Sequence, residues 1–311
     1  MHRACLSLLL FLTIVISSFA QSKKPNKTKV VPLSPAGIKA EGSFIYTYVD
    51  DQHRRRMSAE VFRPTNTTEP APVIVMFFGG GWQNGRPALF VPLAQHLSLR
   101  GYVTVIPNYR LSGEAPFPAA VHDCKAAIRW VRANAKRFNA DANKISVLGG
   151  SAGGHLSAFL AATNGDPQFE GKGDHQKFSS EVQAAIVMCG PVNMLNQGIV
   201  DRVEAGATSK EGDAILDFMG GVPPSVDDTI YRLASPITHL DQDMPPALFI
   251  DGELDNPRLR YTDFWKKMDV LGIHHDFVLM PKAPHPFWVS EEWFHPTVEA
   301  VDMFLKKTLR Y

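Results

Sequence analysis

Residues 145–156 read ISVLGGSAGGHL, and this stretch decides the fold class. Ile145–Leu148 is apolar almost without interruption, as expected of a strand buried on both faces of a sheet. Residues 149–153 match Gly-x-Ser-x-Gly, and an apolar helical pattern begins at Ala152. Strand, turn and helix together form the context of a nucleophile elbow, a strained turn that exposes its serine above the sheet. The stretch predicts Ser151 as a nucleophile. The alternative is a glycine-rich turn that contains serine by chance, and the flanking strand and helix argue against it.

Apolar β-type runs and helical patterns alternate along the chain. The predicted strands are Phe44–Val49, Met57–Phe62, Val73–Phe78, Tyr102–Tyr109, Ile145–Leu148, Val182–Met188, Ala247–Asp251 and Asp276–Met280. The predicted helices are Leu89–Arg100, Ala119–Phe138, Ala152–Thr163, Arg258–Leu271 and Glu291–Leu309. This alternation predicts an α/β fold with an eight-stranded, mostly parallel sheet and helices on both faces. Segments 164–181 and 191–244 are too long for simple connections, so we expect a small cap insertion there.

The composition is that of a globular protein. Of 311 residues, 45% are hydrophobic and 20% are charged. The 32 basic and 31 acidic side chains nearly balance, so nothing electrostatic attracts the chain to nucleic acid or to an anionic membrane surface. Neither is expected as a partner, and the sequence leaves the oligomeric state open.

Residues 1–20 have the pattern of a secretory signal peptide. A positively charged start precedes the apolar run Cys5–Ile16, and small residues end at Ala20. The run is shorter than the roughly 20 residues of a spanning helix, which argues against the alternative of a membrane anchor. We therefore expect a secreted or periplasmic protein without a membrane span in its mature form, with a linker at 21–40 and one α/β domain at 41–311. Whether Cys124 and Cys189 pair or stay free is open.

A nucleophilic serine needs a base, and the base needs an orienting carboxylate. The loop after the seventh predicted strand contains Asp255, the predicted acid, with Asp251 and Glu253 as its competitors. The loop after the eighth predicted strand contains His285, the predicted base. The order Ser151, Asp255, His285 is the one that this elbow-bearing fold uses.

Three glycines, Gly79–Gly81, follow the third predicted strand. A glycine backbone can approach a substrate closely and direct N–H groups at a developing negative charge. Gly80, Gly81 and Ala152 are the predicted oxyanion donors, and a merely flexible turn is the alternative. Trp82 and Trp288 are expected at the rim as substrate-binding residues, although aromatic residues near a cleft also serve in plain packing.

The glycine run, the elbow, Asp255 and His285 together resemble the α/β-hydrolase superfamily. Within it the chain is similar to hormone-sensitive-lipase-like esterases and to bacterial carbohydrate esterases of the acetyl xylan or feruloyl esterase type. Residues 234–237, ASPI, resemble the carbohydrate-esterase branch. The resemblance implies a serine carboxylic-ester hydrolase, with no metal and no organic cofactor, acting on a small ester or an acylated polysaccharide.

Two positions depart from the lipase-like pattern. Such relatives usually have histidine before the three glycines and often aspartate before the nucleophile, where this chain has Phe78 and Gly150. Phe78 leaves open how the glycine loop is held, and Gly150 favours the carbohydrate-esterase branch.

Two other functions stay open at this point. A prolyl-oligopeptidase-like peptidase shares the elbow, but the chain has no room for its propeller domain. A non-catalytic binding protein could keep the fold, although such proteins typically lose one of the three catalytic positions, all of which are filled here.

Overall fold

The computed structural model describes residues 36–49, 55–209 and 212–310. The predicted signal peptide and most of the predicted linker lie outside these residues. No helix in the described ranges is long and apolar enough to cross a bilayer.

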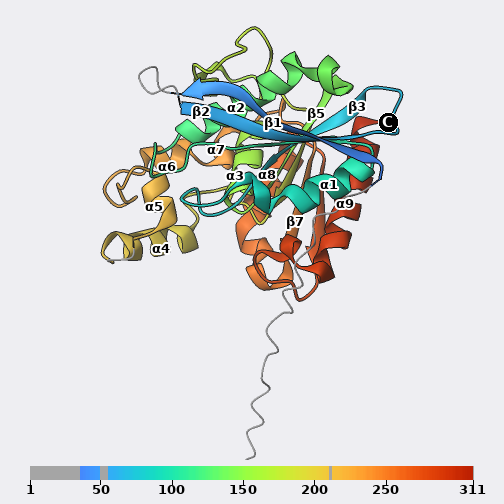
Figure 1. Ribbon diagram of the computed structural model, residues 1–311. Helices are drawn as coiled ribbons and strands as arrows, with labels where there is room; N and C mark the ends of the chain where they lie inside the picture. Colours follow the sequence, from blue (N-terminus) through green and yellow to red (C-terminus); the bar gives the residue numbers. More distant parts are fainter. Residues whose placement is uncertain (1–35, 50–54, 210–211, 311) are drawn as a thin grey trace, which may run out of the picture.

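One eight-stranded sheet organises the described part of the chain (Figure 1). The strands are β1 (Ile38–Val49), β2 (Arg55–Pro64), β3 (Ala71–Phe77), β4 (Val103–Pro107), β5 (Ala140–Gly150), β6 (Ala184–Met188), β7 (Ala247–Gly252) and β8 (His275–Met280). Their order is β1-β2-β4-β3-β5-β6-β7-β8. The β1–β2 and β2–β4 pairs are antiparallel, and all later pairs are parallel. This is the mostly parallel sheet that the sequence predicted.

Burial explains why these sequences form these strands. Every residue of β3, β4, β6 and β7 is buried, because helices cover the central strands on both faces. The edge strands β1 and β8 are only partly buried. A partly exposed edge strand can pair through its backbone without a continuous apolar run. β1 therefore begins at Ile38, before the apolar run that predicted it, and includes the last residues of the predicted linker.

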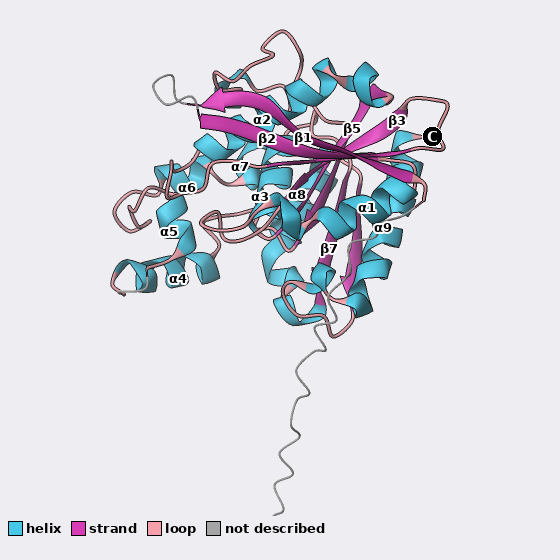
Figure 2. Cartoon of the chain, viewed as in Figure 1, coloured by secondary structure: helices cyan, strands magenta, loops and turns pink. Residues whose placement is uncertain are grey.

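Helices form a layer on each side of the sheet (Figure 2). They are α1 (Val91–Leu99), α2 (Ala119–Ala133), α3 (Ala152–Ala162), α8 (Pro257–Leu271) and α9 (Glu291–Leu309), with the shorter α4 (Gln197–Ala207), α5 (Ala214–Phe218), α6 (Thr229–Leu233) and α7 (Pro236–His239). The helix α1 packs on α9, and α2 packs on α3. All five predicted helices are present, except that α2 ends at Ala133 and a short 3-10 turn, η2 (Ala135–Phe138), completes the predicted range.

The two segments expected to form a cap differ in where they lie. Segment 164–181 is mostly irregular and packs near α2 through the turn η3 (Pro167–Phe169). Segment 191–244 contains α4 to α7, and Figure 1 shows α4, α5 and α6 together at one side of the molecule. Only this second segment reaches the cavity above Ser151, as described below.

Cys124 and Cys189 are both buried and free. The core therefore contains thiols at these two positions and no disulfide between them.

Candidate active site

Ser151 lies at the turn between β5 and α3, in a backbone conformation that side chains rarely adopt. Its φ is 57° and its ψ is −120°. Glycines make so sharp a turn possible. A Cβ added to Gly149 would lie 2.0 Å from the Gly153 carbonyl oxygen, and one added to Gly153 would lie 1.9 Å from the Phe77 carbonyl oxygen. Because both neighbours are backbone atoms, they cannot rotate away, and the strand and helix can meet here only without side chains.

His285 joins Ser151 to Asp255. Its Nε2 lies 3.0 Å from the Ser151 Oγ, and its Nδ1 lies 2.9 Å from an Asp255 carboxylate oxygen. Since an ionised carboxylate can only accept, Nδ1 is assigned as the protonated nitrogen, and the Nε2 lone pair then faces the serine hydroxyl. The three residues come from the carboxyl ends of β5, β7 and β8, so the parallel sheet itself brings them together.

The competing acids occupy other places. Glu253 accepts a hydrogen bond from the Lys282 backbone N–H at 2.8 Å. Asp251 is fully buried and accepts from the Cys189 thiol at 3.1 Å and from the Gly252 N–H at 2.8 Å. Within the described ranges, Asp255 is the carboxylate hydrogen-bonded to His285.

Arg260, in the first turn of α8, braces this carboxylate. One of its η nitrogens lies 3.1 Å from the Asp255 carboxylate and donates to the Asp255 backbone carbonyl at 3.2 Å, while the other donates to Asp251. Burial works to raise the pKa of Asp255, but hydrogen bonds from His285 and Arg260, with their positive charge, outweigh it and hold that pKa well below its ordinary range. Asp255 is therefore ionised at neutral pH. Arg260 was not predicted as a site residue, and the available signal was an arginine early in the helix that follows the acid-bearing loop.

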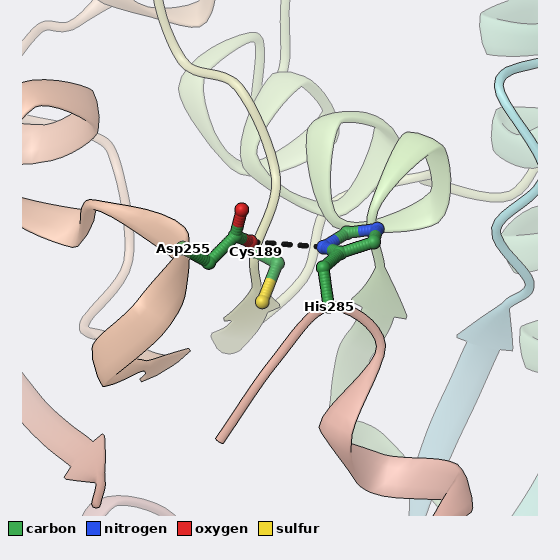
Figure 3. Close-up of side chains that lie close together, drawn as sticks. All are labelled: Cys189, Asp255 and His285. Atoms are coloured by element: carbon green, nitrogen blue, oxygen red, sulfur yellow. Dashed lines mark hydrogen bonds and ion pairs between the residues drawn. The ribbon is translucent and has the colours of Figure 1, made fainter. Parts of the chain in front are cut away.

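Cys189 lies close to Asp255 and His285, as Figure 3 shows. Ligand atoms of the three side chains lie within 4.8 Å of one another, a residue set that can hold a metal ion. The surroundings do not fit a cation. The Cys189 thiol donates a hydrogen bond to Asp251, burial raises its pKa, and the Arg260 guanidinium already contacts the Asp255 carboxylate. Nδ1 and the carboxylate are likewise engaged with each other. The polar atoms of all three side chains therefore already have protein partners, Asp251 for Cys189 and each other for Asp255 and His285.

The glycine loop after β3 lies against the elbow. A Cβ on Gly79 would lie 2.7 Å from the Gly150 carbonyl oxygen and 3.0 Å from the Ser151 Cβ. Gly81 and Ala152 line the cavity that contains Ser151, whereas Gly80 does not line it. The carbonyl of Gly80 closes the loop by accepting from the Gln83 N–H at 3.2 Å and the Asn84 N–H at 3.0 Å. Two of the three predicted donors thus face the cavity.

That cavity measures about 610 Å³ and lies between the sheet edge and segment 191–244. The segment contributes Ile199 and Arg202 from α4, and Asp213, Ala214 and Ile215 at the start of α5. Arg202 forms an ion pair of 2.8 Å with Asp213, whose carboxylate also accepts hydrogen bonds from the backbone N–H groups of Ile215 and Leu216. The ion pair therefore joins the two cap helices above the site.

The two tryptophans predicted to bind substrate occupy different surroundings. Trp82 lines the cavity, with its ring stacked on Phe218 at 4.6 Å between centroids. Trp288 is not part of the cavity lining, and both tryptophans are buried, with Trp82 3% and Trp288 5% exposed. A Cβ on Gly150 would lie 2.4 Å from the Trp288 ring, and the same ring meets His285 edge to face at 5.7 Å. Trp288 thus packs against the elbow and the histidine, and its packing accounts for glycine before the nucleophile.

The fold and the sequence match those of known esterases. A family model described as BD-FAE matches residues 59–259. The esterase LipC of Mycobacterium tuberculosis is 29% identical over 252 residues, which is 78% of this chain. The chain spans only 60% of the length of that relative.

Solved structures cover more of the fold. A truncated carbohydrate esterase from gut microbiota superposes with a TM-score of 0.74 at 25% identity, covering 89% of this chain and 99% of its own. The propionate-bound thermophilic esterase Est2 of the Planctomycetes species Thermogutta terrifontis gives a TM-score of 0.68 at 27% identity, covering 89% of this chain and 96% of its own. These comparisons show the α/β-hydrolase fold and confirm the esterase branch that the motifs resemble.

Proposed function

This chain belongs to the BD-FAE family of α/β-hydrolase-fold proteins, and from that premise we propose that it is a serine carboxylic-ester hydrolase. The observation that carries the proposal is His285, hydrogen-bonded on one side to Ser151 and on the other to Asp255. Esterases among its relatives and structural neighbours support the same activity.

The reaction runs through an acyl-enzyme. The Ser151 Oγ attacks the ester carbonyl while His285 Nε2 takes its proton, and Asp255 stabilises the imidazolium that forms. Negative charge on the tetrahedral oxygen is stabilised by two backbone N–H groups, that of Gly81 in the glycine loop and that of Ala152 at the start of α3. His285 then gives the proton to the leaving alcohol, and a water molecule, activated by the same histidine, releases the acid.

The acyl group is a small one, acetyl or feruloyl, removed from a polysaccharide or a related ester. A Cβ on Gly81 would lie 3.0 Å from the Ala214 Cβ, so the start of α5 in the cap lies close to the glycine loop. This closeness favours acetyl over the bulkier feruloyl group. The carbohydrate esterase among the structural neighbours supports the sugar-linked alcohol.

The protein is exported, and residues 1–20 are removed on the way. Support comes from the charged start, short apolar run and small residues of this segment. N-terminal sequencing of protein secreted by an expression host should read from Gln21. A mature chain that still begins at Met1 would contradict export by this signal.

Hydrolysis of p-nitrophenyl acetate by wild type and by Ser151→Ala tests the activity. We expect turnover by wild type and a loss of at least about 10³-fold in the variant, with unchanged thermal unfolding. Acetate release from acetylated xylan, measured alongside, tests the natural substrate. Equal turnover by both proteins would remove Ser151 from the reaction, and no turnover by either would support a non-catalytic binding protein.

A further inference from the structure

A second cavity of about 310 Å³ adjoins the one above Ser151. It lies between residues 191–199, which lead into α4, and residues 255–260, which lead into α8. Pro191, Ile199, Asp255 and Arg260 line both cavities. The two spaces are therefore neighbours that share a wall made by the acid and its arginine.

The position of this cavity places it on the alcohol side of a bound ester. The leaving alcohol must receive its proton from His285 Nε2, so it lies toward His285 rather than toward the glycine loop. Asp255 holds the opposite nitrogen of that ring, and Asp255 lines the second cavity. A leaving alcohol longer than one ring would extend past His285 in this direction.

The walls present polar and apolar groups together. The side-chain oxygen of Asn193, Oδ1, accepts a hydrogen bond from the Leu195 N–H at 2.9 Å. The side-chain amide nitrogen of Asn193 has no hydrogen-bond partner within the described residues. Asn256 is exposed and likewise makes no side-chain hydrogen bond there. Beside these amides lie Ile199 and Leu259, the latter 75% exposed. Free amides next to aliphatic carbon match a sugar ring, whose edge bears hydroxyl groups and whose face is made of C–H groups.

We propose that the cavity between residues 191–199 and 255–260 is a subsite for a carbohydrate unit attached to the acylated sugar on the alcohol side. The amides of Asn193 and Asn256 bind its hydroxyl groups, and Ile199 and Leu259 contact its ring face. The assignment rests on the proposed esterase activity and adds where the enzyme binds the sugar unit next to the acylated one.

Substrate length tests this assignment. We would measure kcat/KM on monoacetylated xylose and on monoacetylated xylotriose, with p-nitrophenyl acetate as the measure of the esterase reaction itself. Wild type should prefer the longer sugar ester by about tenfold, which corresponds to roughly 1.4 kcal/mol of added binding. If p-nitrophenyl acetate is not hydrolysed at all, the proposed esterase activity has failed. If it is hydrolysed and the two sugar esters react equally, or neither reacts, the subsite is wrong.

A variant that fills the second cavity tests whether the preference for xylotriose arises there. Gly198 lines the cavity, and a Cβ there would lie 3.5 Å from Asn196 Oδ1, an ordinary contact, so Gly198→Phe can be built with little strain. It should reduce the preference for xylotriose to near one. Gln197→Phe places the same ring one residue earlier, outside the cavity lining, and should retain the wild-type preference. Loss of the preference in both variants, or in neither, overturns the location.

A second variant removes an amide without filling the space. Asn256 has φ 52°, a conformation that glycine adopts freely, so Asn256→Gly should fold. We expect KM for the xylotriose ester to rise about threefold to tenfold, as for the loss of one hydrogen bond to a sugar hydroxyl. An unchanged KM would remove Asn256 from the subsite.

Discussion

The Tyr109 hydroxyl donates a hydrogen bond of 2.7 Å to the Phe78 carbonyl oxygen, and the two rings stack with their centroids 4.4 Å apart. Both side chains are buried. Phe78 immediately precedes the three glycines, at the position where lipase-like relatives have histidine. The loop beside Ser151 is thus fixed by a tyrosine acting on its backbone.

Tyr109→Phe should lower kcat for p-nitrophenyl acetate about threefold to tenfold, because the glycine loop loses the hydrogen bond that fixes its first carbonyl. Ring stacking survives this change, so thermal unfolding should shift only slightly. Tyr109→Leu, which also removes the stacking, should reduce both kcat and stability. A Tyr109→Phe enzyme with unchanged kcat would show that the loop is held by its glycines and turn alone.

Asp255→Asn should reduce kcat by about 10⁴-fold, because an amide no longer stabilises the imidazolium and favours the wrong tautomer. The neighbouring Glu253→Gln supplies the matched control, since that carboxylate contacts the Lys282 backbone and not His285. Steady-state kinetics on p-nitrophenyl acetate measure both. A large loss in Glu253→Gln with little loss in Asp255→Asn would exchange the two acids.

Arg260→Gln should lower kcat for p-nitrophenyl acetate about tenfold, because Asp255 loses the ion pair that holds its carboxylate beside His285. The arginine's positive charge faces Asp255 from one side, and Asp251 and the Cys189 thiol lie behind it. Arg260→Lys keeps the charge and should retain most of the wild-type rate. An unchanged kcat in Arg260→Gln would show that its loop alone holds Asp255 in place.

Gly150→Ala should destabilise the fold by about 1–3 kcal/mol, since its Cβ would meet the Trp288 ring at 2.4 Å. Activity should also fall, because Trp288 contacts His285. The double variant Gly150→Ala/Trp288→Leu should recover part of the stability, as measured by urea unfolding. If the single variant is as stable as wild type, Trp288 moves more freely than its packing indicates.

The free energy of unfolding should fall as the pH drops from about 6.5 to about 4. Burial lowers the pKa of His155 to about 4, against the opposing effect of its hydrogen bond to the Ala234 carbonyl. Between these values the unfolded chain binds a proton that the folded chain does not, so stability decreases with falling pH, by about 3 kcal/mol in total. Urea unfolding at pH 7 and pH 4.5 should show a smaller difference in His155→Gln than in wild type. Equal differences would assign the effect to other groups.

Much of the fold could be predicted because its central strands are buried on both faces and are therefore continuously apolar. The relative places of Ser151, Asp255 and His285 followed from chain order, since the carboxyl ends of parallel strands meet at one edge. The bounds of β1 were less readable, because an exposed edge strand pairs through its backbone and needs no apolar run.

Features that depend on contacts between distant segments were not predictable. Tyr109, just after β4, donates to the carbonyl of Phe78, just after the neighbouring strand β3, and no spacing in the sequence indicates this contact. Arg260 lies only five residues after Asp255, but its role depends on the direction that the first turn of α8 gives its side chain. Trp288 was predicted at the rim because of its place after His285, yet it packs against Gly150 of the elbow. In segment 191–244, short helices have too few turns to show periodicity, so the sequence predicted only that a cap exists.

The reacting groups and the cap have separate origins in the chain. The nucleophile, base, acid and glycine loop each follow a different strand of the sheet, whereas every cap residue that lines the cavity belongs to the single insertion between β6 and β7. A recombination that exchanges this one insertion would change the substrate preference and leave the catalytic residues at the ends of the strands unaltered. Esterases of this architecture can therefore diversify by replacing one contiguous stretch of sequence, while the residues that perform the reaction are retained.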